Sequence, residues 1–149
     1  MRPLEQSRAV FRLSPAAETI RLGLPDGAVE ECAPLLKAAL GPIARDASLL
    51  LTTWRHDGHP DHEAVAEVTS RVAREVSVPM AQFPIWACYA DPCEFQGNLR
   101  GWHMSDEALR AKRVALRAFM SQMSLIDGFP RLPAHVAARF LSPIEAYIV

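Results

Sequence analysis

The chain has 149 residues, of which 50% are apolar, and a formal net charge of −1 at pH 7. This length and composition are typical of one globular domain that buries about two-thirds of the surface of its unfolded chain. The balanced charge does not favour binding to nucleic acid or to an anionic membrane. The sequence also has no apolar run of membrane-spanning length and no signal-peptide core, which predicts a cytoplasmic protein.

The three cysteines are an odd number and lack a paired CxxC spacing. This pattern argues against a disulfide framework and against a zinc knuckle. We expect Cys32 on the apolar face of a helix, in the core. Cys88 and Cys93 are expected in a loop around Asp91-Pro92, with little support as metal ligands.

The first part of the chain predicts two helices and a short strand. The residues from Arg2 to Leu13 have helical spacing of their apolar positions. Glu18 to Leu24 is expected to form a strand that ends at the turn signal Pro25-Asp26-Gly27. Helical spacing returns from Val29 to Ile43, and Gly41-Pro42 is expected to end that helix.

The second part of the chain predicts three strands and two helices. Ser48 to Trp54 is an apolar, β-favouring run, and valines at helical spacing from Val65 to Val76 predict the helix that follows it. Met80 to Ala90 is a strand-like run interrupted by a proline, and Gly97 to Met104 is a further candidate strand. Ser105 is expected to cap a helix that extends to Met123.

The alternation of helices and strands predicts an α/β fold with a parallel sheet. An open doubly wound sheet usually begins with a central strand. No such strand precedes the opening helix, so the sheet is expected to lack its first strand. The edges left unpaired would invite another chain or a second copy of this one.

The stretch Trp54 to Glu63 contains three of the five histidines of the chain. It joins a predicted strand to a predicted helix, which is where ligands bind in open α/β sheets. Pro60 suits the first helical turn, which places His59 near the N-cap and Asp61 and His62 in the first turn. The positive end of the helix favours a neutral, metal-binding His62, whereas Asp61 favours the protonated form of His59.

A helix cap with solvated neighbours accounts for the same residues without any ligand. The histidines at positions 56, 59 and 62 are three residues apart, and side chains at this spacing drift around a helix. The zincin pattern of two histidines four apart with an intervening glutamate is also absent. If zinc binds to this stretch, further ligands have to come from elsewhere.

Asp57-Gly58-His59-Pro60-Asp61-His62, followed by Glu63-Ala64-Val65, resembles the second signature of the PIG-L/LmbE family of zinc-dependent N-deacetylases. The resemblance covers nearly the whole chain and therefore indicates a single domain, residues 1–149. The other segments that resemble the family are Arg2 with Glu5, Leu22 to Gly27, Lys112 to Leu116 running to Ser121-Gln122, and Glu145-Ala146-Tyr147.

The resemblance implies a Rossmann-like, mostly parallel sheet flanked by helices. It also implies a hydrolase in which zinc activates a water for attack on the acetamide of an N-acetylated sugar, such as N-acetylglucosamine, or of a similar small molecule. His62 would be a zinc ligand, and His59 would stabilise the oxyanion or protonate the leaving amine. Asp61 would orient and charge His59, and Arg2 and Asp57 would contact the substrate.

One part of the family pattern is missing. The family's first signature, His-Pro-Asp-Asp-Glu, is absent from these 149 residues, and it supplies two of the three zinc ligands and the general base. Because catalytic zinc normally takes three protein ligands, the chain alone is expected to be inactive.

Three interpretations remain open. We favour an N-terminally truncated domain that belongs to a longer or split enzyme and is completed by an N-terminal segment. The chain would otherwise be an inactive relative used for binding or assembly, or would bind metal in an unfamiliar way. Self-association is compatible with each of them.

Overall fold

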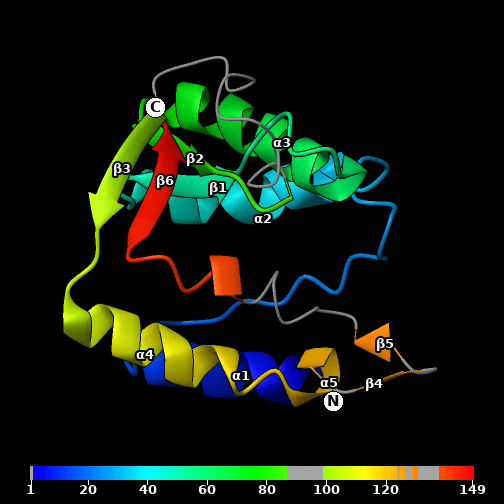
Figure 1. Cartoon of the computed structure of the whole chain (residues 1–149). Helices are drawn as coiled ribbons and strands as arrows, with labels where there is room; N and C mark the ends of the chain where they lie inside the picture. Colours follow the sequence, from blue (N-terminus) through cyan, green and yellow to red (C-terminus); the bar gives the residue numbers. More distant parts are fainter. Residues whose placement is uncertain (1, 87–98, 124, 127–128, 131–137) are drawn as a thin grey trace. The chain divides into compact units, whose positions relative to one another are not determined.

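The computed structural model describes residues 2–86, 99–123, 125–126, 129–130 and 138–149. These residues divide into two compact units. The first unit consists of residues 1–20 and 102–145, and the second of residues 21–101 and 146–149. Each unit is described by itself below, with the labels of Figure 1.

The first unit is built around a helix pair, α1 (Arg2–Leu13) and α4 (Asp106–Leu116), which pack against each other (Figure 1). The small residues Ala9 and Ala115 are buried. Ser105 caps α4 as predicted, because its hydroxyl accepts a hydrogen bond from the backbone N–H of Ala108 at 3.2 Å.

The helix predicted to run from Ser105 to Met123 is wrong in its extent. α4 ends at Leu116, and a short helix, α5 (Met120–Met123), follows. At this break the backbone N–H of Ser121 donates to the carboxylate of Glu5 at 2.8 Å, and the Ser121 hydroxyl donates to the same carboxylate at 2.6 Å. In one continuous helix the backbone N–H of Ser121 would donate to a carbonyl of the preceding turn. Here it donates to Glu5 of α1 instead.

Two short strands, β4 (Leu125–Ile126) and β5 (Phe129–Pro130), pair antiparallel. The larger sheet has the strand order β1-β2-β6-β3. Its members are β1 (Leu50–Thr53), β2 (Met80–Phe83), β6 (Ile144–Ile148) and β3 (Leu99–His103).

The pairing in this sheet is mixed. β1 and β2 are parallel, with Leu50 opposite Met80 and Thr53 opposite Phe83. β6 is antiparallel to β2, with Ile148 opposite Gln82. The predicted α/β fold is therefore confirmed, and so is its parallel core, whereas the closing segment of the chain adds an antiparallel strand.

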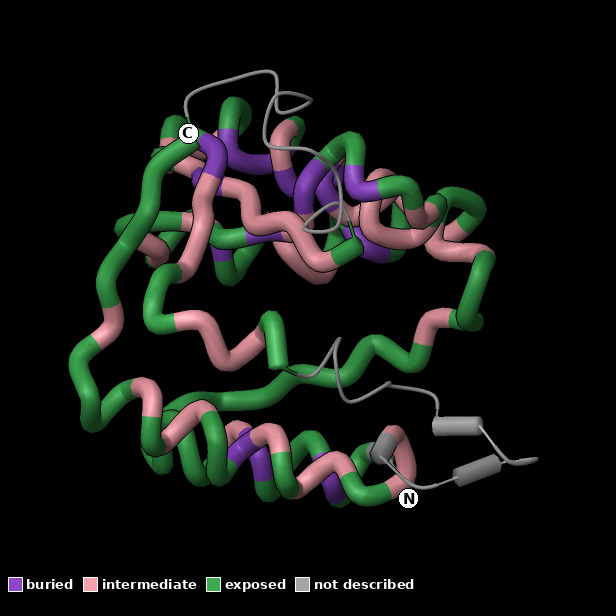
Figure 2. Tube along the Cα trace, in the orientation of Figure 1, coloured by how far each residue is buried: buried purple, intermediate pink, exposed green. Residues whose placement is uncertain are grey.

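Helix α3 (Pro60–Val76) connects β1 to β2 and packs on both strands, and α2 (Ala33–Arg45) packs on α3. The buried stretches of α3 are shown in purple in Figure 2. The predicted valine face is confirmed, because Val68 and Val72 are buried and Val65 and Val76 pack against them. The core cluster consists of Leu36, Ala44, Val68 and Val72.

The strand predicted from Glu18 to Leu24 is wrong, because residues 14–32 contain neither helix nor strand. Ile20 is 62% exposed, so this segment lacks the buried apolar face that stabilises a strand within a sheet. Gly23 has a φ of +66°, which interrupts an extended path.

The predicted end of the second helix at Gly41-Pro42 is also wrong, because α2 continues to Arg45. Pro42 removes one backbone donor only one turn from the helix end. The burial of Ala44 against α3 offsets that loss. Cys32 lies at the N-cap of α2 and is half-buried, so its predicted place on a helix face is wrong as well.

The remaining strand predictions hold where the structure describes them. β2 ends at Phe83, just before the proline that was expected to interrupt the run. β3 lies within the predicted strand from Gly97 to Met104. Cys88 and Cys93 lie outside the described residues. Within the described part of the chain, none of the helices has the length and apolar character needed to cross a bilayer.

Candidate functional site

The site lies where β1 ends and α3 begins. The ladder continues past β1, because the N–H of Trp54 donates to the carbonyl of Phe83 at 3.0 Å. Gly58 then turns the chain with a φ of +73°, a conformation that glycine adopts without strain. His59 is the N-cap of α3 and Pro60 its first residue, so both predicted positions are confirmed.

The start of α3 is fastened to the end of β1. The hydroxyl of Thr53 donates to the backbone carbonyl of His62 at 2.7 Å. The side chain of Glu63 accepts from the N–H of Gly58 at 3.1 Å, which closes the loop between the two elements. Glu63 was quoted from the sequence as part of the signature stretch, but neither it nor Thr53 was assigned a role there, although a glutamate in the first turn of a helix is a known capping signal.

Asp57 is the buried centre of the site, with a side-chain exposure of 0%. One carboxylate oxygen accepts from the N–H of Ile85 at 2.8 Å and from that of Trp86 at 3.0 Å. The other oxygen, Oδ2, lies 2.5 Å from Nδ1 of His62. These hydrogen bonds join the oxygens of Asp57 to protein groups, and its predicted contact with the substrate stays a prediction.

His62 is oriented by Asp57. An ionised carboxylate only accepts hydrogen bonds, so Nδ1 of His62 carries the proton of this pair. In the neutral ring the lone pair is then on Nε2. Metal-binding histidines share this pattern, in which the second ring nitrogen donates to a carboxylate. The side chain is 22% exposed, so it is accessible at the surface of the site.

His59 offers a different group. Its Nδ1 accepts a hydrogen bond from the backbone N–H of Asp61 at 3.3 Å. A neutral His59 therefore carries its proton on Nε2, as a hydrogen-bond donor. The rings of His59 and His62 are stacked, with centroids 4.5 Å apart and planes 26° from parallel. The site thus brings a donor ring against an acceptor ring.

The carboxylate of Asp61 is bonded to the loop that precedes α2. It accepts from the N–H of Gly27 at 2.7 Å and from that of Val29 at 3.2 Å. The hydrogen bond from Gly27 is the main reason why the pKa of Asp61 is below its ordinary value; desolvation opposes this shift, and the bond from Val29 and the neighbouring histidines add to it. Only the backbone N–H of Asp61 bonds to the His59 ring, so a catalytic role for its carboxylate stays a prediction.

The third histidine of the stretch, His56, packs its ring edge against Trp54, with centroids 5.5 Å apart and an interplanar angle of 86°. Among the described residues, no three histidine, cysteine or acidic side chains are grouped so that they could hold a metal. His62 would supply one ligand, whereas catalytic zinc takes three. The described donor set therefore does not fit a catalytic zinc by itself.

Segments quoted separately for the family resemblance bond to one another in the structure. Glu5 bonds to Ser121, Gly27 bonds to Asp61, and Lys112 forms an ion pair with Glu145. These pairs join positions that lie 33 to 116 residues apart in the sequence. These residues therefore form part of the scaffold of the chain. Arg2 begins α1, and its side chain lies outside the described part of the structure.

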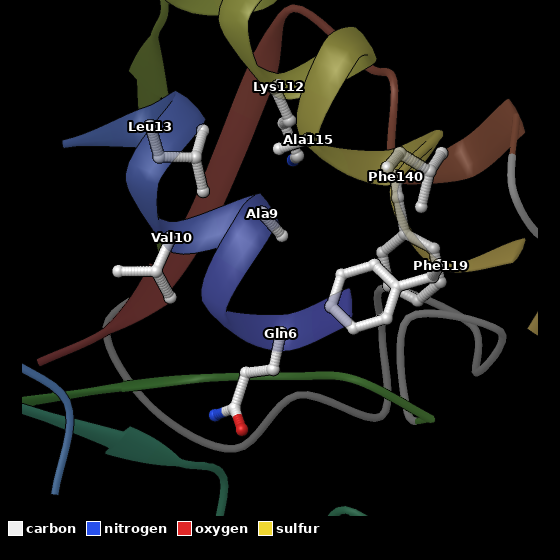
Figure 3. Close-up of a pocket in the computed structure, with 9 residues that line it drawn as sticks. Gln6, Ala9, Val10, Leu13, Lys112, Ala115, Phe119 and Phe140 are labelled. Atoms are coloured by element: carbon white, nitrogen blue, oxygen red, sulfur yellow. The ribbon is translucent and has the colours of Figure 1, made fainter. Parts of the chain in front are cut away.

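Each of the two units also has a concavity. An apolar pocket in the first unit has a volume of about 300 Å³. Figure 3 shows Ala9 and Leu13 from α1 and Ala115 from α4 among its walls. The ammonium of Lys112 pairs with Glu145, so no reactive group is offered there. A polar groove of about 600 Å³ lies along α3 in the second unit, and Glu67 within it is paired with Arg55 and Arg71.

The sequence matches no protein-family model and no curated protein. The fold is nevertheless a known one, because solved structures of deacetylases share this α/β arrangement of a sheet flanked by helices. The A40926 pseudoaglycone deacetylase Dbv21 matches with a TM-score of 0.66 and 19% identity, over 99% of this chain and 70% of that protein.

Two structures from the teicoplanin pathway agree with this match. The zinc-inhibited form of teicoplanin deacetylase Orf2 has a TM-score of 0.57 and 19% identity, over 89% of this chain and 57% of Orf2. A triple mutant of the deacetylase has a TM-score of 0.62 and 19% identity, over 97% of this chain and 68% of its own. The chain thus has the fold of deacetylases, as the resemblance implied, and spans 57% to 70% of their length.

Proposed function

We propose that this chain belongs to a zinc-dependent N-deacetylase that hydrolyses the acetamide of an N-acetylated sugar. The observation that carries the proposal is the pairing of His62 with the enclosed carboxylate of Asp57, in a fold shared with deacetylases. That pairing keeps Nε2 of His62 in the state that binds a metal. The small-molecule substrate class follows from the neighbours, which are named for teicoplanin and for the A40926 pseudoaglycone.

The proposed roles divide between the two stacked rings. His62 is one zinc ligand, and two further ligands and a general base come from a segment outside the described residues, in a longer or split enzyme. His59, whose Nδ1 accepts from the backbone N–H of Asp61, donates a hydrogen bond from Nε2 to the acetamide oxygen as negative charge develops on it. Asp57 holds His62 in place, and Asp61 holds the loop around Gly27 next to the start of α3.

Complementation in trans tests this proposal. The chain is mixed with zinc, an N-acetylglucosaminyl glycoside and a separately produced segment that ends a strand with His-Pro-Asp-Asp-Glu, and released acetate is measured by mass spectrometry. We expect acetate only in the complete mixture, and none with His62→Ala. His103→Ala is the matched control, because His103 is an exposed histidine of β3, and it should keep the activity. Equal acetate release with and without His62 would refute the metal role.

A binding module without catalysis is the second candidate function. It is favoured by the incomplete ligand set of the described residues. This candidate predicts that the chain binds the N-acetylglucosaminyl glycoside in calorimetry, without zinc and without releasing acetate under any complementation. Binding that requires zinc, followed by turnover, would exclude it.

A further inference from the structure

The chain that follows β2 runs alongside the loop that follows β1. The backbone N–H of Trp54 donates to the carbonyl of Phe83 at 3.0 Å, and that of Arg55 donates to the side-chain oxygen of Gln82 at 2.8 Å. Further along, the carboxylate of Asp57 accepts from two backbone N–H groups that follow β2. The two segments are therefore joined by hydrogen bonds from the strand ends up to the candidate site.

The backbone of Trp86 and the ring of His62 bond to the same oxygen atom. Oδ2 of Asp57 lies 3.1 Å from the backbone nitrogen of Trp86, which donates to it, and 2.5 Å from Nδ1 of His62. Ligands of open α/β sheets bind at the edge where the parallel strands end. Trp86 follows β2 at this edge, so it lies at the rim of the candidate site.

Trp86 is not a core residue. It is 47% exposed, whereas Trp54 in the neighbouring segment is 5% exposed. A single exposed apolar residue is ordinary on a protein surface. Trp86 differs from such a residue because an enclosed carboxylate fixes its backbone next to the stacked histidines. Tryptophan offers a large, rigid contact surface and has few side-chain torsions to lose on binding, so it suits a ligand contact at this position.

We propose that the indole of Trp86 is a stacking platform for the sugar ring of the N-acetylated substrate, and that it makes the site prefer a cyclic sugar to an open-chain acetamide. The axial C–H groups of a pyranose with the glucose configuration form an apolar face. Their partial positive charge is attracted to the negative face of an aromatic ring, and the flat contact adds dispersion. The inference rests on the proposed function for the identity of its ligand.

Different groups of the site bind different parts of this substrate. The acetamide is bonded directly to the sugar ring, so a sugar whose acetamide oxygen accepts from His59 has to lie beside the start of α3. The side chain of Trp86 begins at a backbone that shares an oxygen with His62. The stacked histidines therefore act on the acetamide, and Trp86 binds the ring that carries it. In this arrangement Trp86 determines specificity and takes no part in bond breaking.

NMR of the full chain tests the inference without turnover. The indole N–H signals are followed during titration with methyl N-acetyl-β-glucosaminide, and with N-methylacetamide, which has the amide but no ring. The signal of Trp86, assigned from its loss in Trp86→Phe, should shift saturably with the glycoside only. Trp54 is buried, and Trp102 is 70% exposed on β3, the terminal strand opposite β1, so their signals should not change.

Substitutions separate the indole from the backbone group. Trp86→Ala keeps the N–H that donates to Asp57, so the nitrogen-15 signals of the His62 ring should stay unchanged. The affinity for the glycoside should fall roughly three- to tenfold, and Trp86→Phe, which keeps a flat ring, should retain most of it. Trp102→Ala is the matched control and should bind the glycoside as the unmodified chain does.

An unchanged Trp86 signal throughout the glycoside titration would overturn the inference, and so would an equal loss of affinity in Trp86→Ala and Trp102→Ala. Altered His62 ring signals in Trp86→Ala would also overturn it, because they would show a structural role for the indole. The two proposals fail separately. Without acetate release in any complementation mixture the proposed hydrolysis is refuted, whereas a saturable shift of the Trp86 signal would still support the stacking platform.

Discussion

Oδ2 of Asp57 lies 2.5 Å from Nδ1 of His62, five residues later in the chain. The first residue is fully enclosed and the second is partly exposed. A buried charge is tolerated only when its oxygens have partners. Here the partners are one histidine and the backbone N–H groups of Ile85 and Trp86, which follow β2. The pair therefore couples the orientation of His62 to the packing of two strand ends.

Replacement of Asp57 by asparagine should change the tautomer of His62. The amide oxygen can still accept from the N–H groups of Ile85 and Trp86, but its NH₂ group then faces Nδ1 of His62. Nδ1 would have to accept, and the ring proton would move to Nε2. Nitrogen-15 NMR of the ring reports this shift, and Asp26→Asn in an exposed turn is the control. An unchanged His62 tautomer in Asp57→Asn would contradict the proposed orientation.

Replacement of Asp57 by alanine should destabilise the second unit. The N–H groups of Ile85 and Trp86 lose their hydrogen bonds to the Asp57 carboxylate, and a hydrogen bond to a charged group contributes about 1.5–3 kcal/mol. We expect a lower midpoint in urea unfolding with an unchanged slope, and a smaller effect for Asp57→Asn, which keeps an acceptor. A midpoint equal to that of the unmodified chain would show that water replaces the carboxylate without cost.

The contacts of Asp61 predict a contribution to the free energy of unfolding that is lost at acid pH. The hydrogen bond from Gly27 is the largest cause that lowers the pKa of this carboxyl in the folded chain. A group with a lowered folded pKa stabilises the fold above its unfolded pKa, and this contribution is lost as the pH falls through the folded pKa. Asp61→Asn should therefore have a lower melting temperature than the unmodified chain at pH 7. This difference in melting temperature should become smaller below about pH 4.

The control for this prediction is Asp26→Asn, a change in the same loop at a carboxyl that is exposed. Its melting temperature at pH 7 should be close to that of the unmodified chain. A parallel loss of stability on acidification in the unmodified chain and in Asp61→Asn would contradict the proposed link between Asp61 and the Gly27 loop.

Zinc affinity of the chain alone should be weak. In the proposed enzyme His62 would be one zinc ligand. Asp57 bonds to the other ring nitrogen of His62, so it cannot replace a missing ligand on the metal. Calorimetric titration at neutral pH measures the affinity directly. Stoichiometric binding below micromolar concentration, abolished in His62→Ala, would mean that the chain assembles a complete metal site alone.

Substitution of each of the two stacked histidines should have a different effect on the complemented enzyme. His62→Ala should remove metal and activity together. His59→Ala should retain metal and lower the rate by roughly a hundred- to a thousandfold, as expected for the loss of one oxyanion partner. Metal content by mass spectrometry and turnover by acetate release distinguish them. Equal loss of metal in both variants would show that the role given to His59 is wrong.

Local patterns in the sequence were sufficient for the elements that build the site. The strand before Trp54, the helix from Pro60 and the N-cap at His59 follow from apolar periodicity and from the fixed backbone of proline, and the structure has them at those positions. The α/β class follows in the same way from the alternation of elements. These features depend on neighbours within about one helical turn, which the sequence displays directly.

Partners that are distant in the sequence were decided only by the tertiary structure. The motif gives no sign that Asp57 is enclosed by amides that follow β2, or that the carboxylate of Asp61 bonds to the Gly27 loop, 34 residues earlier. The expected strand at Glu18 to Leu24 failed for a related reason. A strand needs a paired edge and a buried face, and both are supplied by distant parts of the chain, whereas a helix satisfies its own backbone.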